Sequence, residues 1–175
     1  MVRKVAIIGN SGGGKTRLAR RLGQIHGLPV THVDSVQFLP GMVIRPHAQS
    51  IEILDEVHTH DEWIIDGYGP LDILEERLAL ADKIVMVDFP IWRHAWWCAK
   101  RQVQNLWSPR AELPEGCHEV SWTQTRRLFK ALRNVHEKMH PEMRRILQRP
   151  AHREKVIWIR TVAEWNALHR SGIPN

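Results

Sequence analysis

Residues 9 to 16 combine the residue types and the spacing that phosphate binding needs. The segment is Gly-Asn-Ser-Gly-Gly-Gly-Lys-Thr, and it follows the apolar run at residues 5 to 8. Glycines allow backbone conformations that are closed to other residues, so successive N–H groups can converge on a phosphate. In this pattern the lysine contacts the β and γ phosphates and the threonine hydroxyl is a ligand of Mg²⁺. The sequence predicts an Mg-ATP site formed by Gly9, Asn10, Ser11, Gly12, Gly13, Gly14, Lys15 and Thr16.

Three aspartates, Asp34, Asp66 and Asp88, come at the ends of apolar segments that have the composition of buried strands. In open parallel sheets, ligands bind beyond the carboxyl ends of the strands. We therefore expect up to three carboxylates near the phosphate loop. The alternative for Asp34 and Asp66 is a structural role as a helix cap or turn residue. For Asp88, which precedes Phe89 and Pro90, we favour a structural role.

Basic residues in the C-terminal half could surround a phosphate in transit, which phosphoryl transfer requires. They occur on two expected helices and on the loop between them: Arg93, Lys100, Arg101, Arg110, Arg126, Arg127 and Arg133. Among these, Arg101, Arg110 and Arg127 are our candidate catalytic residues. The alternative for each is a solvated arginine on a helix surface, which is a common role for this residue type.

Apolar runs and helical periodicities alternate along the chain, and this order must position the candidate residues. We expect strands at the apolar run before the loop and at residues 29–34, 62–66, 83–88 and 155–159, with an irregular segment at 35–47. We expect helices at residues 16–26, 48–60, 71–81, 91–106, 121–139 and 162–169. Alternation of this kind predicts an α/β fold of the P-loop NTPase class, with a five-stranded parallel sheet covered by helices on both faces.

Length and composition limit the other possibilities. The 175 residues fit one domain spanning 1–175, and the Pro- and Gly-containing segment at 107–120 is a lid-like loop between two helices. No apolar run is long enough to span a bilayer, so we expect a cytoplasmic protein. Two distant cysteines indicate neither a disulfide framework nor a zinc site. The net charge of +6 suits anionic partners without choosing among them.

Several of these segments resemble adenylate kinases and related small-molecule kinases. Ile64-Ile65-Asp66-Gly67 resembles the Asp-Gly signature beside their phosphate loop, which implies that Asp66 orients Mg²⁺, usually through water. Asp34 matches a position where such kinases place a carboxylate that binds metal or accepts a hydrogen bond or proton from the substrate hydroxyl. Arg101 follows Pro90 at a spacing similar to that of a lid-hinge arginine. The resemblance therefore implies ATP and Mg²⁺ as cofactors, with Thr16 and Asp66 on the metal side.

At full length the chain resembles the DNA topology modulation protein (FlaR-related) family, a branch of adenylate-kinase-like P-loop kinases. The resemblance runs from Gly9 to about Trp165. It is carried by the phosphate loop and by the segments 29–34, 38–41, 63–68, 77–78, 81–82, 93–101 and 115–119. The chain departs from adenylate kinases after Asp66-Gly67, where Tyr68-Gly69-Pro70 lacks the usual arginine, so an AMP site of that type is in doubt.

The function predicted from the sequence is transfer of the γ-phosphate of Mg-ATP to a small-molecule acceptor held between residues 35–60 and the lid-like loop. The acceptor class stays open, and a nucleoside monophosphate is one option. The alternative is a nucleotide-dependent regulator that binds DNA, which the family name and the basic charge suggest. No helix-turn-helix or zinc finger is visible, and charge alone supports only salt-sensitive, non-specific binding. For the assembly we expect a monomer or a homodimer.

Overall fold

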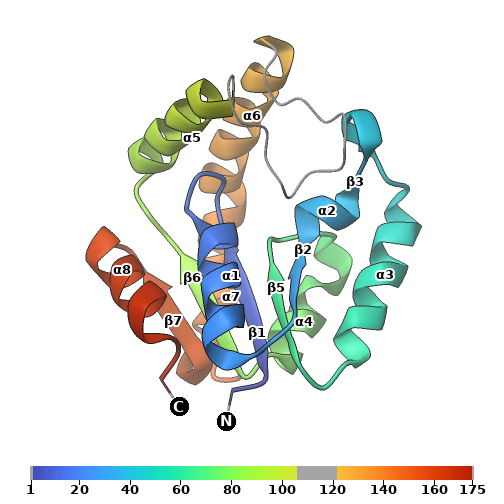
Figure 1. Ribbon diagram of the computed structural model, residues 1–175, viewed down its shortest axis with the longest axis vertical. Coiled ribbons are helices and arrows are strands. Elements are labelled where there is room, and N and C mark those ends of the chain that lie inside the picture. Colours follow the sequence, from blue (N-terminus) through green and yellow to red (C-terminus); the bar gives the residue numbers. More distant parts are fainter. Residues whose placement is uncertain (1, 106–121, 175) are drawn as a thin grey trace.

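The computed structural model describes residues 2–105 and 122–174, and a central parallel sheet organises them (Figure 1). The sheet has five strands in the order β2-β5-β1-β6-β7. Their bounds are β1 Lys4–Gly9, β2 Val30–His32, β5 Trp63–Asp66, β6 Lys83–Val87 and β7 Val156–Ile159. Because β1 is central and pairs with β5 and β6, its carboxyl end lies between the carboxyl ends of those two strands. The predicted parallel sheet is confirmed.

Helices cover both faces of the sheet, because alternate apolar side chains of β1 point to opposite faces and all of them are buried. Val5 and Ile7 pack in one apolar cluster with residues of α1 and α8, whereas Ala6 and Ile8 pack in the other with residues of α3, α4 and α7. Successive side chains of a strand point to opposite faces, so a strand buried on both faces is apolar at every position. These helices are α1 Lys15–His26, α3 His47–Thr59, α4 Leu74–Leu80, α7 His140–Leu147 and α8 Val162–Ser171.

Two long helices, α5 (Ile91–Asn105) and α6 (Trp122–Asn134), lie side by side beyond the carboxyl ends of the strands (Figure 1). The predicted lid-like loop at 107–120 falls outside the described residues. The helix expected over 121–139 does not continue regularly, because a π-helical turn, Val135–Met139, separates α6 from α7. The prediction missed α7 itself, which supplies Met143, Ile146 and Leu147 to the core.

The segment after β2 also differs from the expectation. Residues 33–37 form a short helix, α2 (Val33–Gln37), and a small antiparallel hairpin follows, with β3 (Phe38–Leu39) paired to β4 (Val43–Ile44). Val33 and Val36 are buried at i, i+3 spacing, so core packing favours helix over the predicted strand end and irregular segment. Among the described residues, no helix has the length and apolar character that crossing a bilayer requires.

Candidate nucleotide site

The phosphate loop joins β1 directly to α1, and its glycines are required by close packing. A Cβ at Gly9, where φ is 142°, would lie 2.4 Å from the Val87 carbonyl oxygen of β6. At Gly12, where φ is 74°, it would lie 2.7 Å from the His94 carbonyl oxygen of α5. Both positions therefore exclude a side chain. The loop is pressed between neighbouring elements, which fixes the backbone whose N–H groups would contact a phosphate.

Lys15 and Asn10 hold the loop in shape from within. The Lys15 ammonium donates a hydrogen bond to the Asn10 carbonyl oxygen at 3.0 Å. The Asn10 side chain is buried; its Nδ2 donates to the Leu132 carbonyl oxygen of α6 at 2.8 Å, and its Oδ1 accepts from the Ser11 N–H at 2.9 Å. Lys15 thus lies against the loop, in the position from which a cation reaches bound phosphates. Asn10 has a structural role in addition to the predicted contact with the nucleotide.

His94 of α5 supports the loop from outside and was not identified from the sequence. Its ring is fully buried, and Nδ1 donates to the Ser11 carbonyl oxygen at 2.9 Å. Burial lowers the pKa of His94 to about 4. The nearby Lys15 and His140 also lower this pKa, whereas the hydrogen bond to Ser11 raises it. The imidazole is therefore neutral at pH 7. The sequence shows only one of eleven scattered histidines, and the contact joins residues far apart in the chain.

Asp66 lies at the end of β5, beside Ile7 of β1, and its carboxylate is only partly satisfied. Oδ2 accepts a hydrogen bond from His32 Nδ1 at 3.1 Å, whereas Oδ1 is buried and accepts none from any described residue. A buried acceptor without a partner is costly unless a ligand or water satisfies it. The residues therefore fit a hydrated Mg²⁺ near Asp66. No group of three or more His, Cys, Asp or Glu residues that could hold a metal exists in the described chain, so Thr16 and Asp66 would hold the ion together with phosphate and water ligands.

His32, rather than Asp34, ends β2 and lies opposite Asp66 in the strand register. Asp34 falls in the first turn of α2 and is partly buried, so the expected strand-end position is wrong. Sequence reasoning missed His32, although the alternating pattern of a short strand could have identified the residue beside the Asp-Gly pair. Asp34, the carboxylate predicted for the acceptor side, therefore lies two residues after the end of β2, in the helix α2 that directly follows the strand.

Of the three candidate arginines, the structure describes the side chain of Arg127 alone. The backbone of Arg101 lies in α5, Arg110 falls outside the described residues, and Arg127 is exposed on α6. No described contact joins Arg127 to the loop. The described contact between α6 and the loop is the hydrogen bond from the Asn10 side chain to the Leu132 carbonyl oxygen. The catalytic roles of these arginines remain predictions.

Asp88, immediately after β6, is bound on two sides by α7. Arg144 contacts it with two hydrogen bonds, Nη2 to Oδ1 at 2.6 Å and Nε to Oδ2 at 2.9 Å, and His140 Nδ1 lies 3.3 Å from Oδ1. Burial raises the pKa of Asp88, but the contacts with His140 and Arg144 outweigh it and hold the pKa well below its usual range. This bidentate pair fits the structural interpretation of Asp88.

A fully buried arginine, Arg77 of α4, fixes the backbone that follows Asp66. Its Nη1 donates to the carbonyl oxygens of Gly67 and Tyr68 at 3.1 and 3.0 Å, and its Nε donates to His58 Nε2 at 3.1 Å. Burial lowers the pKa of Arg77 to about 10, and burial followed by the Arg77 charge lowers the pKa of His58, which leaves His58 neutral as an acceptor. Arg77 therefore replaces water for two partly buried carbonyls and holds the turn rigid.

Comparisons with known proteins support this fold. No protein-family model matches the chain, and no curated protein matches it. The chain is similar to the shikimate kinase of Acinetobacter baumannii in complex with shikimate, with a TM-score of 0.54 and 15% identity over 96% of this chain and 92% of that one. It is similar to a sugar kinase of Janibacter sp. HTCC2649 (TM-score 0.50, 14% identity, 96% and 93% covered). It is also similar to TT1252 of Thermus thermophilus (TM-score 0.52, 14% identity, 99% of both chains covered).

The chain therefore has the α/β fold of P-loop NTPases, as the sequence predicted. The likeness to solved structures lies at identities of 14 to 15%, which is a likeness of fold. The narrower resemblance to the topology modulation family is not supported by these comparisons, and neither is the DNA-binding alternative.

Proposed function

We propose that this protein is a P-loop kinase that transfers the γ-phosphate of Mg-ATP to a small acceptor bearing a hydroxyl group. One observation carries the proposal. A phosphate loop with its lysine in place lies beside a buried carboxylate, Asp66, whose Oδ1 has no partner among the described residues. The fold shared with proteins named shikimate kinase and sugar kinase supports the same reaction class.

The proposed roles follow the positions of the residues. Lys15 and the backbone of residues 9–16 bind the phosphates, and Thr16 and Asp66 hold Mg²⁺, which neutralises charge on the phosphates when bound. Asp34 accepts the proton of the acceptor hydroxyl, whose oxygen forms the new bond to phosphorus as the bond to the ADP oxygen breaks. Arg101, Arg110 and Arg127 are proposed to stabilise the charge on the transferred group.

The acceptor side favours a hydroxylated metabolite over a nucleoside monophosphate. Residues 35–60 contain a single arginine, Arg45, and no lysine. The Arg45 Nε donates to the Val36 carbonyl oxygen at 2.7 Å, and His47 pairs with Asp72 at 2.7 Å, so both side chains have partners within the protein. Binding an acceptor phosphate normally takes positively charged side chains or several N–H donors. A neutral polyol or hydroxy acid places a smaller demand on this segment.

The test is ADP production from Mg-ATP, with sugars, hydroxy acids, nucleosides and nucleoside monophosphates added one at a time. One acceptor should stimulate turnover, and Lys15→Ala should abolish the stimulation because it removes the cation on the β and γ phosphates. Saturable ATP binding without stimulation by any acceptor would count against a kinase. Unchanged nucleotide affinity in Lys15→Ala would contradict the assignment of the phosphate loop.

A further inference from the structure

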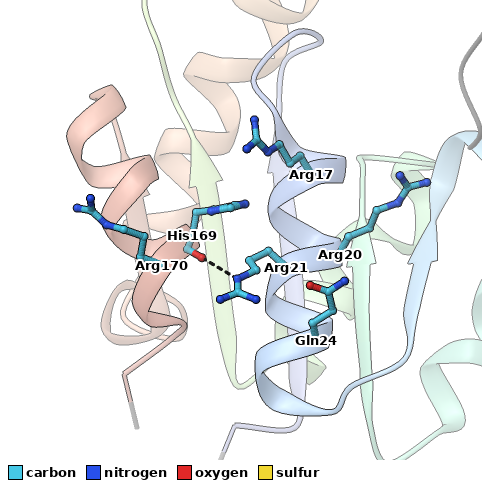
Figure 2. Close-up of a pocket in the computed structure, with 6 residues that line it drawn as sticks. All are labelled: Arg17, Arg20, Arg21, Gln24, His169 and Arg170. Atoms are coloured by element: carbon cyan, nitrogen blue, oxygen red, sulfur yellow. Dashed lines mark hydrogen bonds between the residues drawn. The ribbon is translucent and has the colours of Figure 1, made fainter. Parts of the chain in front are cut away.

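A basic groove lies between α1 and α8, on the face of the molecule that these helices cover. It has a volume of about 510 Å³ and is lined by Arg17, Arg20, Arg21, Gln24, His169 and Arg170. The lining includes four arginines and no carboxylate. Figure 2 shows that the groove starts near the phosphate-loop end of α1 and extends along the helix to Gln24. Its lining belongs to none of the catalytic roles proposed above.

Two of the arginines are held in the groove by contacts that join the helices. Arg21 Nε donates to the His169 carbonyl oxygen at 3.3 Å. The Arg17 guanidinium lies 5.6 Å from the centroid of the Trp165 ring, and that ring stacks on His169 at 4.7 Å with an interplanar angle of 18°. The side chains that reach across the groove are therefore already ordered, which lowers the entropy cost of binding a ligand there.

The four guanidinium groups differ in position. Figure 2 shows Arg17 and Arg21 extending from α1 toward α8, whereas Arg20 extends to the opposite side of α1 and Arg170 extends outward from α8. Arg17 and Arg21 thus form the centre of the groove, one helical turn apart. Arg20 and Arg170 stand at its margins and add to the positive potential. Burial lowers the pKa of His169, and the charges of Arg17 and Arg21 lower it further, as expected in a positive field.

We propose that this groove is a second anion site, which binds a soluble small molecule carrying two or more linked phosphates. Guanidinium groups match phosphate oxygens with paired hydrogen bonds, and adjacent arginines on one helix can contact successive phosphates. A volume of about 510 Å³ lies within the range of small-molecule sites. The lining comprises six residues on two neighbouring helices, and this limited extent favours a compact anion over a nucleic acid.

The experiment uses inorganic tripolyphosphate as the probe and the full-length Lys15→Ala protein as the background. Lys15→Ala weakens phosphate binding at the loop, so binding at the groove can be followed by itself. Binding is measured by calorimetry at about 50 mM and 300 mM salt, and its location by amide chemical shifts in NMR spectra. We expect shifts at Gln24, His169 and Arg170, and an affinity that falls steeply with salt because most of the lining is exposed.

Two variants test the lining, and a third serves as a matched control. The double variant Arg21→Gln/Arg170→Gln should weaken tripolyphosphate binding at least tenfold. Arg170→Gln alone should weaken it about threefold and leaves the hydrogen bond between α1 and α8 in place. Arg153→Gln removes an arginine that does not line the groove and whose side chain is 64% exposed, and it should leave the affinity within about twofold. Folding of every variant is checked by its NMR spectrum.

Three outcomes would overturn the proposal. The first is tripolyphosphate binding that persists unchanged in the folded groove variants. The second is binding that disappears with Lys15→Ala alone, which would leave the phosphate loop as the site. The third is a response of the groove amides to a short DNA duplex but not to tripolyphosphate, which would assign the surface to a macromolecule. None of these outcomes depends on kinase activity, so the groove and the proposed kinase reaction are tested separately.

Discussion

Asp66 and Asp88 flank the phosphate loop at the ends of β5 and β6, and the protein satisfies them to different degrees. Asp88 has a bidentate arginine and a histidine around it, all supplied by α7. Asp66 has one histidine, and its second oxygen is buried without a described partner. A carboxylate that is fully paired holds two elements together but has little capacity left for a ligand. The comparison therefore separates a structural aspartate from one that is ready to contact a metal or its water.

The largest effect should follow from removing the Asp66 charge. In Asp66→Asn we expect turnover with the stimulating acceptor to fall about 10²- to 10³-fold, because an electrostatic contact to the metal is lost in the transition state. The rate of ADP production at saturating ATP measures this effect. Asp61→Asn, in the exposed bend that precedes the same strand, is the matched control and should retain full activity. Full activity in Asp66→Asn would place the metal elsewhere.

Asp88→Asn should act on stability instead. Removing one partner of a buried ion pair costs about 3 to 5 kcal/mol in full burial. The Arg144 side chain is 40% exposed and can regain water, so we expect a loss of about 2 kcal/mol in the free energy of unfolding. Urea denaturation measures it, again with Asp61→Asn as the control. A large loss of turnover with unchanged stability would reverse the roles of the two aspartates.

The same variant should change the acid stability of the protein. The pKa of Asp88 is lowered in the folded state, so its contribution to stability is present above the unfolded pKa of about 4 and is lost as the pH falls below that value. Between about pH 5 and pH 3, the free energy of unfolding should therefore fall less steeply in Asp88→Asn than in the wild type. Parallel curves for the two proteins would show that Asp88 is not held in its charged form by the fold.

His94 connects the Asp88 side of the site to the loop, because its ring centroid lies 6.3 Å from that of His140. His94→Ala removes the donor to the Ser11 carbonyl and should weaken Mg-ATP binding about tenfold. His94→Asn can place an amide N–H near the position of Nδ1, and should recover most of that affinity. Fluorescence or calorimetric titration with a non-hydrolysable ATP analogue measures both. Equal losses in the two variants would indicate a packing role only.

The smallest effect should come from Arg144→Lys, which keeps the charge opposite Asp88 but cannot make two parallel hydrogen bonds. We expect the free energy of unfolding to fall by about 1 kcal/mol or less, which is at most half of the loss expected for Asp88→Asn. Urea denaturation of the two variants side by side shows the order. A lysine variant as unstable as Asp88→Asn would mean that the geometry of the pair, more than its charge, holds α7 in place.

Local features of the sequence were enough to predict the sheet and the phosphate loop. The strands around β1 are apolar on both faces, and the glycines of the loop occur at fixed spacing, so neither depends on knowing distant contacts. The prediction of α2 as a strand end was wrong, because burial of Val33 and Val36 against the core overrides the β preference of valine. The helix α7 was missed because the π-helical turn before it interrupts the expected periodicity.

The candidate site was predicted less completely than the fold. His94, His32 and Arg77 act through partners that are 83, 34 and 10 residues away in the chain, respectively. Such pairings exist only after the elements have packed, and the local sequence gives no signal for His94 or Arg77 and only the short-strand pattern for His32. Asp66 and Lys15 could be selected because each belongs to a short motif. The side chains that orient and support them come from unrelated segments.

The hydrogen bond from Asn10 to Leu132 bears on the order in which the protein can fold. It joins the first turn of the phosphate loop to a carbonyl 122 residues later in the chain. Contacts of such separation form late, since the entropy of closing the intervening chain must first be overcome. During synthesis, the loop sequence leaves the ribosome long before α6 exists. The loop reaches its final shape only when the C-terminal half has docked.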